Sequence, residues 1–174
     1  LSRSVNVTQN PAVVTIGAIH GGIRHNIIPE EVKLIGTVRT FGDEQQKLVH
    51  KRINEIVINI AESAGATVDL KLEKLYPSTV NNPDLTKEML PSLEAAAGAE
   101  NLIYLNPVTG AEDFSFFQRE KPGVFIFLGG MKKGGDPLTT PSHHTPGFYI
   151  DEGGFVLGMR TLSYFVVDYM EKNK

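Results

Sequence analysis

The sequence predicts a mixed α/β and α+β protein made of two parts. The order strand, strand, helix, strand over residues 1–76 is typical of a partial ferredoxin-like antiparallel sandwich, in which one amphipathic helix covers one face of a sheet. Residues 77–174 alternate helical and strand patterns, which indicates a layered α/β arrangement. Ser, Thr, Asn and Pro cluster at residues 77–83, so we place the domain boundary between residues 76 and 77.

Two strands with a rigid turn begin the first part. Residues 12–19 are rich in β-branched side chains, and residues 32–41 alternate apolar and polar side chains. Between them lies Asn26-Ile27-Ile28-Pro29, where Pro29 fixes its own φ and keeps Ile28 extended. The pattern predicts an antiparallel pair.

A helix and a third strand follow. Asp43 and Gln46 have the spacing of a capping box, apolar residues recur at helical spacing up to Ala64, and Gly65 is placed to end the helix in a left-handed conformation. Residues 67–75 alternate apolar and charged side chains up to Pro77, which predicts a strand. One further strand and helix would be needed to complete the sandwich.

The second part contains six further predicted segments. They are a helix over 85–97 interrupted by Pro91, an apolar strand over 102–105, a short helix over 112–119, a strand buried on both faces over 124–128, a loop over 129–141, and a final helix capped by Asp151.

Composition excludes several classes of protein. The 174 residues carry 17 Lys and Arg against 20 Asp and Glu, and there is no Cys. A net charge of −3 gives no general attraction to nucleic acid, and a chain without Cys has no disulfide, thiolate metal site or cysteine nucleophile. The apolar runs are too short for a membrane span, so we expect a cytoplasmic protein. Because the chain begins with Leu1, we expect it to be a fragment.

His144 is the histidine best placed to bind a ligand. With His143 it lies in a loop held by Pro141 and Pro146, just before a capped helix. Adjacent residues of an extended segment point to opposite sides, so only one of the two would face a given site. The alternative is an ordinary pair of loop histidines, since no HxxxH or HExxH spacing supplies further metal ligands.

Three other residues suit substrate binding. Arg39, near the end of a strand, can hold a carboxylate in a bidentate manner, and Asn26 can offer an amide N–H to an oxyanion. Gly110 leaves its backbone open to a ligand. The alternatives are a surface ion pair for Arg39, a turn-forming role for Asn26, and acids at 112 and 113 that only complement a helix dipole.

The ordered set of these motifs resembles one family. It resembles the metal-dependent amidohydrolases that include aminoacylases, hippurate hydrolases, auxin-conjugate hydrolases and related carboxypeptidases. The resemblance covers nearly the whole chain. Its motifs are Gly21-Gly22, Asn26-Ile27-Ile28-Pro29, Gly36-Thr37-Val38-Arg39, Gly110-Ala111-Glu112-Asp113-Phe114-Ser115, Pro122-Gly123-Val124-Phe125, Leu128-Gly129, His144-Thr145-Pro146 with Phe148, and Asp151-Glu152.

The resemblance implies a role for each candidate residue. Residues 1–76 would be the later part of a lid and dimerisation domain, and residues 77–174 the C-terminal part of the catalytic domain. By the same resemblance His144 is the last metal ligand, Arg39 grips the substrate carboxylate, Asn26 lies near the substrate in cis or across a homodimer, and the backbone of Gly110 approaches the substrate.

The implied chemistry is hydrolysis of the amide bond of an N-acyl amino acid by two divalent metal ions, Zn or Mn, with a Glu as general base. The other metal ligands and that Glu have no counterpart in this sequence, so we expect no catalytic residue in this fragment, no tight metal binding and no activity of the fragment alone. The alternative is a non-enzymatic α+β module that dimerises through an open sheet edge or binds a small ligand.

Overall fold

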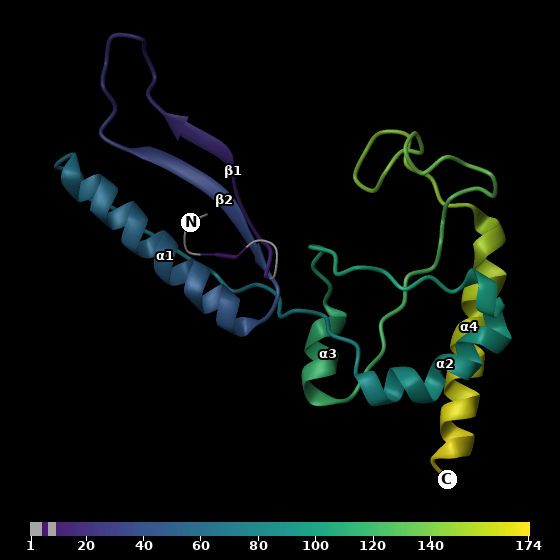
Figure 1. Ribbon diagram of the computed structural model, residues 1–174. Coiled ribbons are helices and arrows are strands. Elements are labelled where there is room, and N and C mark those ends of the chain that lie inside the picture. Colours follow the sequence, from purple (N-terminus) through teal and green to yellow (C-terminus); the bar gives the residue numbers. More distant parts are fainter. Residues whose placement is uncertain (1–4, 7–9) are drawn as a thin grey trace. The chain divides into compact units, whose positions relative to one another are not determined.

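The computed structural model describes residues 5–6 and 10–174, which form two compact units. The first comprises the described residues up to Thr79 together with Pro107–Phe116, and the second comprises Val80–Asn106 and Phe117–Lys174. The described residues form one two-stranded antiparallel sheet and four α-helices, so the mixed α/β class is confirmed (Figure 1). Among these residues, none of the helices combines the length and the apolar character needed to cross a membrane.

The predicted strand pair is confirmed as a hairpin. Strands β1 (Ala12–Gly21) and β2 (Val32–Thr40) pair antiparallel, with Val13 opposite Arg39. The register shifts between Ile16 and Ala18, and a Cβ at Gly36 would lie 2.3 Å from the Thr15 carbonyl oxygen. Only glycine therefore permits this close approach of the two strands.

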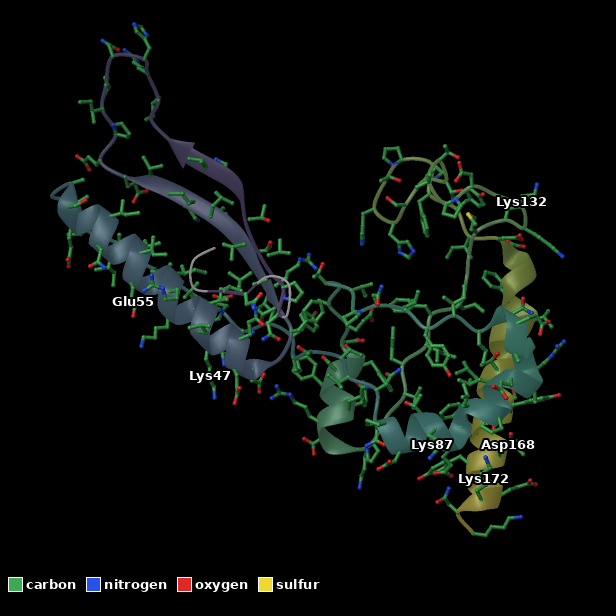
Figure 2. The ribbon with its side chains drawn as sticks, in the orientation of Figure 1. Lys47, Glu55, Lys87, Lys132, Asp168 and Lys172 are labelled. Atoms are coloured by element: carbon green, nitrogen blue, oxygen red, sulfur yellow. The ribbon has the colours of Figure 1, made fainter. Side chains whose placement is uncertain are left out.

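Helix α1 (Asp43–Ser63) contacts β2 and carries the fully buried Val49. Charged side chains such as Lys47 and Glu55 lie on the face of α1 that points away from the hairpin (Figure 2). The capping-box prediction is wrong: the N-cap residue is Gly42, with no side-chain cap.

The predicted left-handed end of α1 is confirmed. Gly65 has φ +70°, and Ala66 N–H donates to the Ala61 carbonyl at 2.9 Å. This 6→1 bond, together with the bond from Gly65 N–H to the Glu62 carbonyl at 3.0 Å, is a Schellman motif.

Three predicted strands are not formed. Residues 67–75, 102–105 and 124–128 have no regular secondary structure, because no described segment provides a ladder partner for any of them. The last was expected to be buried on both faces, yet Phe127 is 59% exposed.

In the second unit, helices α2 (Pro83–Ala97) and α4 (Phe155–Lys172) pack side by side. The α2 face at this contact supplies the buried Met89, Leu93 and Ala96. Pro91 lies inside α2, which bends part-way along its length as expected for a helical proline (Figure 1). At the far end of α4, Lys172 Nζ donates to the Glu88 carbonyl at 2.9 Å (Figure 2).

Short elements complete the second half of the chain. Asn82 caps α2 by accepting from Leu85 N–H at 2.9 Å. Asp151 caps a 3₁₀ turn that leads directly into α4, accepting from Gly153 N–H at 3.0 Å, which agrees with the predicted cap to within one turn. The remaining elements are α3 (Phe114–Glu120) and the 3₁₀ turns η1 (Ala99–Asn101) and η2 (Glu152–Gly154).

Candidate functional site

Arg39 lies near the end of β2 with its side chain exposed. Its Nη1 donates a hydrogen bond to the carbonyl oxygen of Thr109, a residue 70 positions further along the chain in the same unit. No carboxylate among the described residues forms an ion pair with Arg39, so the alternative of a surface ion pair is not what the structure contains. The remaining N–H groups of the guanidinium can bind an anion.

Gly110 follows directly on Thr109. Apart from Gly110 itself and its two chain neighbours, no described residue has an atom within 4 Å of the position that a Cβ would take at Gly110, and among the described residues its N–H has no hydrogen-bond partner. A ligand can therefore approach this backbone closely. The structure brings Arg39 and Gly110 together within one unit.

The acids after Gly110 lie just before α3. The carbonyls of Glu112 and Asp113 accept from Ser115 N–H at 3.3 Å and Phe116 N–H at 3.0 Å, which begins the helix. These are backbone contacts, and no acid lies in the first turn of α3, so they do not involve the carboxylates of Glu112 and Asp113.

Asn26 lies in the turn between the two strands. Ile27 N–H donates to the Arg24 carbonyl at 3.3 Å, so His25 and Asn26 are the central residues of this turn. Arg39 is seven residue steps from Val32 along β2, which is about 23 Å at ~3.3 Å per residue. Within one chain the hairpin therefore holds Asn26 and Arg39 at opposite ends, and the structure does not bring them together.

His144 lies in a loop of the second unit that is closed at its base. Asp151 N–H donates to the Gly130 carbonyl at 2.8 Å, which joins the two ends of the loop. Inside it, Thr145 Oγ1 donates to the Ser142 carbonyl at 2.6 Å, and Phe148 N–H donates to the Thr145 carbonyl at 3.1 Å. These short-range bonds give the exposed His144 a defined backbone.

The backbone of His144 is itself unusual. Its φ of 63° is the only positive φ among the described non-glycine residues. Such a conformation costs about 1–3 kcal/mol and persists where the surrounding structure imposes it, often at functional sites. The ring of the neighbouring His143 packs on Phe148, with centroids 4.6 Å apart, so the two histidines have different surroundings.

The described residues do not form a metal centre by themselves. No three His, Cys, Asp or Glu side chains in this part of the chain are grouped so that they could hold an ion. One imidazole cannot hold two metal ions, because each ion needs several ligands. A dinuclear centre would therefore need ligands beyond those that the described residues gather.

His50 lies on α1, in the first unit. Partial burial lowers its pKa below the ordinary value, and the positive charge of Lys74 lowers it further. The structure leaves this side chain half-buried on α1.

Comparison with known proteins decides the family. A model of peptidase family M20/M25/M40 matches residues 5–168 of the chain. The chain belongs to this family. The resemblance found in the sequence is thereby confirmed.

Curated relatives of the chain include a carboxypeptidase and a deacetylase. Thermostable carboxypeptidase 1 of Saccharolobus solfataricus is 33% identical over 174 residues, which cover 98% of this chain and 42% of the carboxypeptidase. N-acetyldiaminopimelate deacetylase of Streptococcus thermophilus is 38% identical over 130 residues, covering 74% of this chain and 34% of the deacetylase.

A solved structure shares the fold. The Bacillus subtilis YXEP protein, a dinuclear metal-binding peptidase of the M20 family, matches with a TM-score of 0.71 and 26% identity over 92% of this chain and 42% of its own. The chain thus spans about two fifths of the length of the M20 relatives such as this one and the carboxypeptidase.

Sequence reasoning missed the surroundings of Arg39. Thr109, which accepts its hydrogen bond, is 70 positions from Arg39 in the sequence, and no local pattern joins the two residues. Phe148, the packing partner of His143, was within reach of sequence analysis because it lies in the same motif.

Proposed function

We propose that this chain supplies the carboxylate grip and one metal ligand of an amidohydrolase that acts on N-acyl amino acids. The observation that carries the proposal is Arg39, whose guanidinium is held by the Thr109 carbonyl beside the open backbone of Gly110. An arginine without a carboxylate partner at an open position is suited to bidentate binding of a substrate carboxylate. The name of the N-acetyldiaminopimelate deacetylase among the relatives supports an N-acyl amino acid as substrate.

We propose His144 as the one metal ligand of this chain. Imidazole is a common ligand for Zn or Mn, and the strained backbone of His144 is held by a closed loop. The dinuclear metal binding of the YXEP protein supports two ions in the complete enzyme. When bound, such ions supply activated water and Lewis-acid polarisation.

We further propose that Asn26 acts across a homodimer. In one chain Asn26 and Arg39 lie at opposite ends of the hairpin, so Asn26 from a second chain is better suited to reach a substrate held by Arg39. We expect the complete enzyme to be cytoplasmic.

A non-enzymatic dimerisation or ligand-binding module is the second candidate. It is favoured by the exposed apolar side chains of the hairpin, including Ile16 at 51% and Leu34 at 56% exposure. Among the described residues no third strand covers either edge, and such edges favour pairing with another chain.

An assay of the full-length enzyme tests the proposal. We expect the enzyme supplied with Zn²⁺ or Mn²⁺ to release free amino acid from N-acetyl amino acids, and a chelator to stop the reaction. The 174-residue chain alone, at the same concentration, should give no product. The opposite outcome is a full-length protein that dimerises and binds amino acids without hydrolysing any N-acyl amino acid in the presence of either metal. That result would favour the non-enzymatic module.

A further inference from the structure

The way in which Arg39 is held leaves one edge of its guanidinium open. A guanidinium has five N–H donors in a rigid plane, and Nη1 lies on the side of Cδ. Only Nη1 bonds to the Thr109 carbonyl, and among the described residues Nε and Nη2 of Arg39 have no partner. These two nitrogens form the opposite edge, which matches the two oxygens of a carboxylate. The Thr109 carbonyl can therefore orient Arg39 without occupying that edge.

This arrangement depends on the position of residues 107–116, named here the glycine loop. The glycine loop has no strand partner and reaches α3 only at its end, so the backbone around Thr109 needs anchoring from elsewhere. A surface loop with few contacts to the rest of the protein is mobile. A carbonyl group on such a loop would not hold an exposed arginine in one orientation.

Two contacts order the end of the glycine loop, and one of them reaches outside the loop. The ring of Phe116 packs on Tyr76, with centroids 5.8 Å apart and a tilt of 58°. Ser115 is 1% exposed, and its Oγ donates to the Glu112 carbonyl at 2.6 Å. The second contact is internal to the loop end, whereas the aromatic pair joins the loop end to the segment that follows α1.

We propose that Tyr76 and Phe116 are positioning residues for carboxylate recognition. Their ring contact holds the glycine loop so that the Thr109 carbonyl fixes Arg39 with its Nε and Nη2 edge open to the substrate carboxylate. The proposal rests on the proposed function, because it assigns the anion of an N-acyl amino acid to that edge. Neither ring touches the substrate.

Removal of the ring contact should weaken carboxylate binding selectively. Aromatic pairs contribute modestly beyond their buried area, so we expect the affinity for an acid to fall roughly threefold to tenfold. The affinity for the matching neutral amide should not change, because the amide does not depend on Arg39.

The test compares binding of N-acetyl-L-alanine and N-acetyl-L-alaninamide to the ¹⁵N-labelled chain by NMR. The Nε–H signal of Arg39 is assigned by its loss in Arg39→Lys. This signal reports directly whether a ligand binds at the Nε and Nη2 edge of the guanidinium. In the unmodified chain the acid should bind more tightly than the amide and shift this signal. Phe116→Leu and Tyr76→Leu should both reduce the preference for the acid, and Phe116→Tyr, which keeps a ring, should restore it.

Phe127→Leu is the matched control. Phe127 is 59% exposed and pairs with Phe125 at 5.1 Å, whereas Phe116 is 49% exposed, but Phe127 belongs to the other unit. The control should leave the preference for the acid unchanged.

The outcomes separate the inference from the proposed function. If the unmodified chain prefers the acid and both leucine variants keep that preference, or if Phe127→Leu reduces it equally, the inference is wrong and the role of Arg39 stands. If the unmodified chain binds acid and amide equally, the proposed role of Arg39 is wrong, and the inference fails with it. Should Phe116→Leu not fold, Tyr76→Leu and Phe116→Tyr still decide the question.

Discussion

The two candidate loops are held in different ways. The loop that carries His144 is fixed by short-range bonds, from Thr145 to Ser142 and from Phe148 to Thr145, and by a bond that closes its base. The glycine loop is fixed by contacts to residues distant in sequence, namely Arg39 and Tyr76. Substitutions in the first loop should therefore act locally, whereas the second loop can be loosened from elsewhere in the chain.

The largest effect is expected for His144→Ala in the full-length enzyme. Loss of a metal ligand should lower kcat/KM by at least about 100-fold and reduce the metal content, because the remaining ligands hold the ion less well. Elemental analysis together with steady-state kinetics measures both quantities.

His143→Ala is the control for this prediction. Its ring packs on Phe148 at 4.6 Å, so its loss should reduce the activity much less and leave the metal content nearly unchanged. Full metal content and activity in His144→Ala would remove His144 from the metal site.

A smaller effect is expected for Gly147→Ala. Gly147 has φ +87°, a conformation that costs a residue with a side chain about 1 kcal/mol or more. Chemical denaturation should show a corresponding decrease in the free energy of unfolding.

Gly129→Ala serves as the comparison, because Gly129 has no positive φ and open space where a Cβ would lie. Its effect on the free energy of unfolding should be within a few tenths of a kcal/mol. Equal effects of the two substitutions would contradict the view that local backbone conformation fixes the His144 loop.

The smallest effect concerns His50. Its folded-state pKa lies below the unfolded value of 6.5, because burial and then Lys74 disfavour the charged imidazole. The unfolded chain therefore binds more protons in this range, so the contribution of His50 to stability is complete above about pH 6.5 and is lost as the pH falls through the folded pKa.

Unfolding curves measured between pH 8 and pH 5 test the direction in which His50 changes the free energy of unfolding. His50→Gln should lose less stability on acidification than the unmodified chain. A larger loss in His50→Gln would show that the folded state favours the charged imidazole.

The same contrast between local and distant contacts explains which parts of the fold were predictable. The hairpin, α1, α2 and α4 follow from periodicity and turn residues, and the left-handed Gly65 follows from its place after a helix. Residues 67–75 and 124–128 have strand-like patterns, but a strand also needs a partner, which a local pattern does not reveal. The Gly42 N-cap was missed because the capping-box spacing placed the cap one residue later.

In the candidate site, too, local sequence patterns do not reveal contacts between residues that are distant in the sequence. The loop around His144 was predictable because prolines and the Asp151 cap lie close to it in sequence. The bond from Arg39 to Thr109 joins positions 70 residues apart, and only folding brings them together. The functional roles of Arg39, Asn26, Gly110 and His144 stay predictions.

The central claim is that Arg39 binds the carboxylate of the substrate. It is tested most directly by combining Arg39→Ala with removal of the negative charge of the substrate. KM and kcat/KM of the full-length enzyme and of Arg39→Ala are compared for an N-acetyl amino acid and for its neutral amide. A charge-assisted bidentate contact is worth about 1.5–3 kcal/mol, so the substitution should lower kcat/KM for the acid by roughly 10-fold to 150-fold, mainly through KM. The amide should be affected little. Equal losses for acid and amide, or no loss for the acid, would contradict the account.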